Sequence, residues 1–160
     1  MVLSIRRIAG ALGAEISGVD LSKALDRATF DAIHRAYVEH EVIFFRDQTL
    51  TPEQHKAFGR RFGTLNIHPY VKGMEGHPEI MEIIKEPGDR VNFGGGWHSD
   101  MSFMQRPSMG SLLYGVECPP SGADTEFAGM FAAHDALVAL SGALKTLAVA
   151  AMKIANDVRL

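Results

Sequence analysis

Cysteine is nearly absent from the chain: Cys118 is the only one in 160 residues. A single cysteine cannot form an internal disulfide, which excludes the small secreted domains that disulfides hold together. Long apolar runs are also missing, since no stretch approaches the about 20 residues that a membrane-spanning helix needs. The first residues carry paired arginines, but Gly10 and Gly13 interrupt the apolar run that a signal peptide requires. These absences predict a soluble, cytoplasmic protein.

An excess of positive charge is absent as well. Lysine and arginine number 16 against 19 aspartates and glutamates, which gives a formal net charge of -3. Nucleic-acid-binding domains are usually basic, so no nucleic-acid partner is expected. The 46% of apolar and 22% of charged residues are ordinary for a globular protein. The length favours a single domain that spans residues 1–160.

Hydrophobic periodicity predicts the first elements of the fold. Residues 5–21 alternate short apolar stretches with glycines, a pattern typical of strands joined by tight turns. Apolar side chains then recur every three or four positions over residues 29–40, which predicts a helix with one buried face. Residues 41–46 are β-branched and aromatic, which predicts a buried strand.

A second helix is predicted to begin at Thr51-Pro52-Glu53-Gln54. The threonine is a good N-cap, proline suits the first turn, and the glutamine three residues after Thr51 completes a capping box. Phe58 and Phe62 are four residues apart and are expected on the inner face, with Gly63 ending the helix.

The rest of the chain is richer in loops. Glycines and prolines are frequent over residues 66–96, and binding residues often lie on such loops. Strands are predicted over residues 79–85 and 111–118, and an alanine-rich helix from about residue 129. Strands flanked by helices, without regular alternation, predict an α+β fold with a β core and a helical covering.

The segment Gly94–Asp100 holds the sharpest chemical feature. His98 and Asp100 are two residues apart, so on an extended strand both side chains point to the same face. Together they could bind one metal ion, and a second histidine from elsewhere would complete the 2-His-1-carboxylate triad of non-haem iron oxygenases. The alternative is a hydrogen-bonded pair at the end of a surface strand. Trp97 would point to the opposite face and is expected in the core.

Several motifs in register resemble the taurine/2,4-D dioxygenase (TauD/TfdA-like) family of Fe(II)- and 2-oxoglutarate-dependent dioxygenases. The resemblance runs from about residue 5 to residue 147. The motifs that carry it, in the family's order and spacing, are Val42–Gln48, Leu50–His55, Arg61–Gly63, Asn66–Pro69, Trp97–Phe103, Arg106–Pro107 and Pro119–Thr125.

The resemblance implies a fold, a reaction and a ligand set. The fold would be a double-stranded β-helix (jelly-roll, cupin-like) with flanking helices, present here as its N-terminal portion. His98 and Asp100 match the first two ligands of Fe(II), and Thr125 matches a threonine that helps to hold the distal carboxylate of 2-oxoglutarate. The reaction would hydroxylate a small organic substrate and convert 2-oxoglutarate to succinate and CO2.

The resemblance also implies an acidic substrate. His68 matches a histidine that contacts the acidic group of the substrate in taurine-type members, with Tyr70 as the neighbouring aromatic residue, one position early. Those members have an asparagine where this chain has Gly94, and Asn92 lies two residues before it. The expected substrate is therefore a small anionic compound of the taurine/sulfonate or aryloxyalkanoate type, and the departure at Gly94 disfavours taurine itself.

Two parts of the family's site find no match in the 160 residues. The family's second iron histidine and an arginine for 2-oxoglutarate lie far downstream, and neither His134 nor Arg159 stands in the right context. A second chain in a homo-oligomer could supply them, or the sequence is a fragment of a longer product or a shortened relative. The alternative function is a non-catalytic remnant that acts as a binding or assembly module. A hydrolytic zinc site of His98, Asp100 and His134 is a third hypothesis.

Overall fold

The structure is a computed structural model that describes residues 2–10, 12–86, 88–90, 93–119 and 125–127. The chain divides into two compact units. Unit 1 holds the described residues of Met1–Val19, Asp26–Asp47 and Gly122–Leu160, and unit 2 holds those of Asp20–Leu25 and Gln48–Ser121. Within the residues described, no helix is long and apolar enough to span a membrane. The single domain over 1–160 stays a prediction, and the helix predicted from residue 129 lies outside the described residues.

A three-stranded sheet in the order β1-β2-β3 forms the centre of unit 1. β1 (Ser4–Arg7) pairs antiparallel with β2 (Ala14–Ser17), and β2 pairs parallel with β3 (Ile43–Phe45). The glycine that precedes β2, Gly13, has a φ of 100°, a backbone conformation that other residues rarely adopt. These strands confirm the pattern of short strands and tight turns predicted from the first residues.

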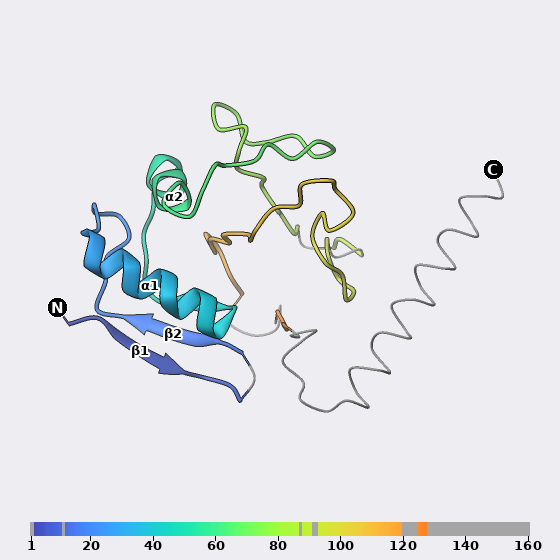
Figure 1. The fold of residues 1–160 in the computed structure, drawn as a ribbon. Helices are drawn as coiled ribbons and strands as arrows, with labels where there is room; N and C mark the ends of the chain where they lie inside the picture. Colours follow the sequence, from blue (N-terminus) through green and yellow to red (C-terminus); the bar gives the residue numbers. More distant parts are fainter. Residues whose placement is uncertain (1, 11, 87, 91–92, 120–124, 128–160) are drawn as a thin grey trace. The chain divides into compact units, whose positions relative to one another are not determined.

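Helix α1 (Arg27–His40) covers this sheet, as Figure 1 shows beside β2. Asp26 caps its N-terminus by accepting a hydrogen bond of 2.8 Å from the backbone N–H of Thr29. Phe30, Ile33 and Ala36 are buried, which confirms the predicted inner face. β3 was expected to be a buried strand but is only half-buried, because among the described residues it lies at the edge of the sheet.

Helix α2 (Pro52–Gly59) belongs to unit 2 and begins with the predicted capping box of Thr51 and Gln54. It ends four residues before Gly63, so the predicted end was wrong. The chain tightens after Gly59, where the backbone N–H of Phe62 donates to the Gly59 carbonyl at 3.0 Å. Phe62 therefore follows the helix, yet its ring still packs edge-on against the buried Phe58, with the ring centres 5.4 Å apart.

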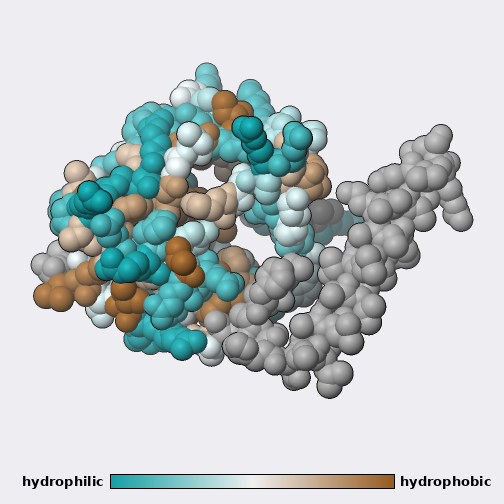
Figure 2. Space-filling view, in the orientation of Figure 1, coloured by the Kyte–Doolittle hydropathy of each residue, from teal (hydrophilic) through white to brown (hydrophobic). Residues whose placement is uncertain are grey.

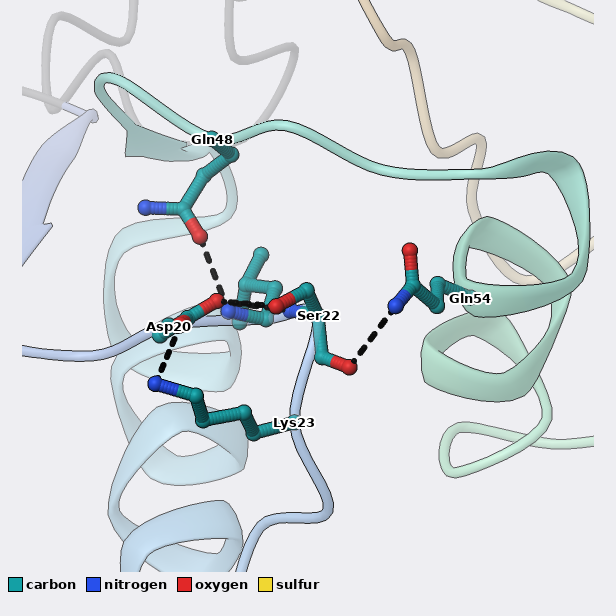
Figure 3. A network of polar contacts seen from close by, with 6 residues as sticks. Asp20, Ser22, Lys23, Gln48 and Gln54 are labelled. Carbon is teal, nitrogen blue, oxygen red and sulfur yellow. Dashed lines mark hydrogen bonds and ion pairs between the residues drawn. The ribbon is translucent and has the colours of Figure 1, made fainter.

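A polar network ties the short segment Asp20–Leu25 to the α2 region within unit 2 (Figure 3). Gln48 accepts a hydrogen bond of 2.8 Å from the Leu21 backbone N–H, and the Gln54 amide donates to the Ser22 carbonyl at 3.1 Å. Asp20 accepts from the Ser22 backbone and hydroxyl and pairs with Lys23 at 2.9 Å. The hydrogen bonds from Ser22, and next that from Lys23, lower the pKa of Asp20 to about 2.

The predicted strands over residues 79–85 and 111–118 are not formed in the part of the chain that the structure describes. A strand exists only when a neighbour completes its hydrogen-bonded ladder, and neither segment has such a neighbour among the described residues. Their apolar side chains remain exposed: Ile84 by 69%, Leu113 by 69% and Val116 by 83%. Figure 2 likewise shows apolar residues on the visible surface.

Ile33 tests the packing of α1 on the sheet. The side chain is fully buried, at 0% exposure. Ile33→Ala is expected to lower the free energy of unfolding by about 2–5 kcal/mol, because it removes buried methyl groups and leaves a cavity. Val38→Ala, at a position 67% exposed on the same helix, is the control and is expected to change it by about 0.5 kcal/mol or less. Equal losses in chemical denaturation of the two variants would contradict this packing.

Candidate metal-binding site

The structure brings the side chains of His98 and Asp100 together in unit 2. Nε2 of His98 lies 3.3 Å from Oδ1 of Asp100. The two residues stand in a turn-rich segment and not on a strand, and Met101 directly after them has a φ of 51°. Both side chains are more than half exposed, at 54% and 62%. The expected proximity is therefore present, but a tight turn and not an extended strand produces it.

A backbone carbonyl sets the tautomer of His98. Nδ1 of His98 lies 2.7 Å from the carbonyl oxygen of Gly96. A carbonyl oxygen can only accept, so Nδ1 carries the proton and Nε2 is the nitrogen turned toward Asp100. Metal-binding histidines commonly use one ring nitrogen as ligand while the other donates to a carbonyl or carboxylate. With Nδ1 donating to Gly96, Nε2 is the ring nitrogen that could bind a metal beside Asp100.

Gly94 leaves room for this ring. Its φ is 68°, and a Cβ placed there would lie 3.1 Å from Cε1 of His98. A side chain at this position would be strained by the backbone and would crowd the imidazole. Glycine here is thus part of how the turn places His98.

The donor pair fits one metal ion. Two ligands at right angles around an ion, with bonds of about 2.1 Å, lie about 3.0 Å apart. The 3.3 Å between Nε2 and Oδ1 needs only a small adjustment to reach that spacing. No group of three histidine, cysteine or acidic side chains that could hold a metal occurs among the described residues. The described part of the chain therefore offers two ligands.

Ser111 is a further member of the site. Its hydroxyl donates to Oδ2 of Asp100 at 3.3 Å, across 11 residues of sequence. Oδ1 faces His98 and Oδ2 is held by Ser111, so the carboxylate is oriented from both sides. Sequence reasoning missed this residue, and a serine at the start of a predicted strand gives no signal of such a contact.

His68 and Tyr70, the predicted substrate residues, also lie in unit 2. Nδ1 of His68 accepts hydrogen bonds from two backbone N–H groups, those of Tyr70 at 3.2 Å and Val71 at 2.9 Å. Nδ1 is therefore the unprotonated nitrogen of the neutral ring, and Nε2–H is left as a donor. The rings of His68 and Tyr70 stand nearly perpendicular with centres 6.1 Å apart. Tyr70 is 73% exposed.

The structure also bears on the remaining residues that the sequence analysis discussed. Thr125 is exposed and belongs to unit 1. Asn92, His134 and Arg159 lie outside the described residues. Trp97 was expected in the core but is 72% exposed. An indole is buried only where other side chains cover it, and the described residues provide no such cover.

Comparison with known proteins identifies the family. The family model described as "Taurine catabolism dioxygenase TauD, TfdA family" matches residues 4–144. The chain therefore belongs to the TauD/TfdA family, as its motifs predicted.

Curated relatives carry related activities. The chain is 39% identical over 136 residues to an alpha-ketoglutarate-dependent sulfate ester dioxygenase of Pseudomonas putida, covering 84% of this chain and 44% of the relative. It is 38% identical to an alkylsulfatase of Acinetobacter baylyi, covering 84% and 42%. It is 33% identical to the alpha-ketoglutarate-dependent 2,4-dichlorophenoxyacetate dioxygenase of Cupriavidus pinatubonensis, covering 78% and 49%. The chain thus spans less than half the length of these relatives.

A solved structure is also similar. A taurine dioxygenase from Burkholderia xenovorans is 39% identical, with a TM-score of 0.45, over 48% of this chain and 28% of that one.

Ser111→Ala tests the orientation of Asp100. Without the hydroxyl, the carboxylate rotates more freely, and the affinity of the chain for Mn(II) or Co(II) is expected to fall about 10-fold. Ser108→Ala is the matched control, because the Ser108 hydroxyl accepts from Asn66. Isothermal titration of the metal measures both affinities. Equal affinities for the parent and Ser111→Ala would show that this hydrogen bond does not orient the ligand.

Proposed function

We propose that this chain carries the first part of the active site of an Fe(II)- and 2-oxoglutarate-dependent dioxygenase that hydroxylates a small anionic organic substrate. The observation that carries the proposal is the His98–Asp100 pair, 3.3 Å apart with Nε2 of the histidine facing the carboxylate. It lies within the region that matches the family, and the contact of Nδ1 with the Gly96 carbonyl leaves Nε2 as the nitrogen for a metal.

Each residue of the site has a role under this proposal. His98 and Asp100 hold Fe(II), and Ser111 keeps the carboxylate turned toward it. Thr125 donates its hydroxyl to the distal carboxylate of 2-oxoglutarate. When bound, the iron with 2-oxoglutarate and O2 supplies the oxidising power that hydroxylates the substrate, leaving succinate and CO2.

The substrate class follows from His68. With Nδ1 occupied by two backbone N–H groups, the ring offers Nε2–H as a donor, which suits the oxygens of an anionic group. The activities for which these relatives are named concern sulfate esters, alkyl sulfates and a phenoxyacetate, all of them anionic. We favour an organic sulfate ester, since the relatives of 39% and 38% identity act on such compounds.

The fold we propose is the double-stranded β-helix. Residues 79–85 and 111–118 have the composition of strands, lack a ladder partner among the described residues and leave apolar side chains exposed. Partner strands from outside the described residues would pair with them and cover these side chains. The second histidine and the arginine of the site would come with those strands, from the rest of a longer product or from another copy.

A turnover assay with His68→Ala tests the proposal. Succinate formation from 2-oxoglutarate is measured with Fe(II), O2 and an alkyl sulfate, an alkyl sulfonate or a phenoxyacetate. Loss of a hydrogen bond to a charged group, about 1.5–3 kcal/mol, is expected to raise KM for the preferred anion about 10- to 100-fold. Substrate-independent decarboxylation of 2-oxoglutarate is expected to stay unchanged.

His34→Ala, on α1 in unit 1, is the control and is expected to behave like the parent. If His68→Ala leaves KM unchanged for every anion, His68 is not the substrate residue. If the parent forms no succinate with any of them, the chain acts as the non-catalytic binding or assembly module.

A further inference from the structure

An ion cluster joins α2 to the turn at residues 74–80. Glu53 and Lys56 lie on α2, Arg60 directly follows it, and His77 and Glu79 lie on the turn. We name these five residues the α2 clamp. All of them belong to unit 2.

Lys56 is the centre of the clamp. Its side chain is only 8% exposed, and Nζ lies 3.0 Å from Oε1 of Glu53 and 3.6 Å from Oε2 of Glu79. Arg60 approaches the other oxygen of Glu79 at 3.7 Å. A buried ammonium group is stable only when carboxylates compensate its lost hydration. Lys56 therefore holds the helix and the turn together.

Both carboxylates are charged at neutral pH. The hydrogen bond from Lys56 is the main reason that the pKa of Glu53 is lowered. The pKa of Glu79 is lowered first by a hydrogen bond from its own backbone N–H and then by the charges of Lys56 and Arg60. Oε2 of Glu79 is buried without a hydrogen-bond partner among the described residues. Its compensation thus depends on the nearby positive charge of Lys56.

The turn that the clamp holds is tightly closed. The backbone N–H of Met74 donates to the carbonyl of Ile80 at 2.7 Å. The backbone N–H of Ile80 in turn donates to the carbonyl of His77 at 2.9 Å. A Cβ on Gly73 would collide with the backbone of Pro78, so only glycine allows this approach. The turn is therefore closed by its own hydrogen bonds, and Glu79 links it to α2 and Arg60.

His68 stands on the chain that leads into this turn. Its Nδ1 is held by the backbone N–H of Val71, which is three residues before Met74. A displaced turn would carry the Val71 N–H away and leave the imidazole with the longer hydrogen bond from the Tyr70 N–H, at 3.2 Å. We infer that Lys56 is a positioning residue for the substrate histidine, which it orients from α2 through Glu79 and the turn. The substrate role of His68 rests on the proposed function, but the mechanical link does not.

Lys56→Met tests this link, because methionine is flexible and of similar reach but lacks the charge. Amide hydrogen exchange is followed residue by residue in the whole chain. Exchange at Val71 and at Met74–Ile80 is expected to become at least about tenfold faster, because local opening no longer breaks an ion pair. Exchange in α1, in unit 1, is expected to match the parent and reports that the variant folds. Lys72→Met, an exposed lysine beside the turn, is the matched control and is expected to change neither region.

Two further variants cover the case in which Lys56→Met fails to fold. Glu79→Gln keeps the size of the side chain and removes its charge, and it is expected to speed exchange at Val71. Lys56→Arg keeps the charge and is expected to restore slow exchange. Unchanged exchange at Val71 in Glu79→Gln or in Lys56→Met overturns the inference.

The substrate readout separates this inference from the proposed function. In an active preparation, Lys56→Met is expected to raise KM for the anionic substrate severalfold and to leave substrate-independent decarboxylation of 2-oxoglutarate unchanged. Faster exchange at Val71 in a chain without turnover would support the link and reject only the proposed function.

Discussion

The hydrogen bond between Nδ1 of His98 and the Gly96 carbonyl is the interaction on which the candidate site depends. It fixes which ring nitrogen is free, and the turn that contains it brings that nitrogen to 3.3 Å from the Asp100 carboxylate. Gly94 suits the turn, since its φ of 68° and the imidazole beside it would strain and crowd a side chain. The Ser111 hydroxyl then donates to Oδ2, the other oxygen of the Asp100 carboxylate. The two candidate ligands and the groups that orient them thus lie within residues 94–111.

The same logic of backbone-fixed side chains recurs at His68. There two backbone N–H groups, in place of one carbonyl, select the opposite tautomer and leave Nε2–H as a donor. Under the proposed function His98 would bind a cation and His68 an anion, although both are histidines on turn-rich segments of unit 2. The difference arises from the backbone group that contacts Nδ1 in each case and from the Asp100 carboxylate beside His98, and composition alone does not reveal either.

Local signals in the sequence predicted the local structure well. The strands near the N-terminus, α1 and the capping box of α2 depend on neighbouring residues, and the structure confirms them. Predictions that depend on distant partners were wrong for the described residues: residues 79–85 and 111–118 form no strands, and Trp97 is exposed. A sequence pattern can indicate that a segment suits a strand, but the strand forms only beside a partner.

The candidate site shows the same difference between what neighbouring residues predict and what depends on distant contacts. The short spacing of His98 and Asp100 and the family motifs predicted the pair, whereas Ser111 and the buried Lys56 emerged only from the three-dimensional contacts. Thr125 lies in unit 1 and Asn92 outside the described residues, so their predicted roles stay predictions. Under the proposed fold, a further set of strands would cover the exposed apolar side chains and also complete the metal site.

The most direct measurement is an anaerobic titration of the chain with Fe(II) and 2-oxoglutarate, read as the visible charge-transfer band of the iron–oxoacid chelate. The account predicts a band that requires both additions and disappears in His98→Ala. Because two protein ligands hold the iron, the chelate is expected to bind weakly. A chain that gives no band, or a band of equal strength in His98→Ala, would contradict the assignment of His98 and Asp100 as iron ligands.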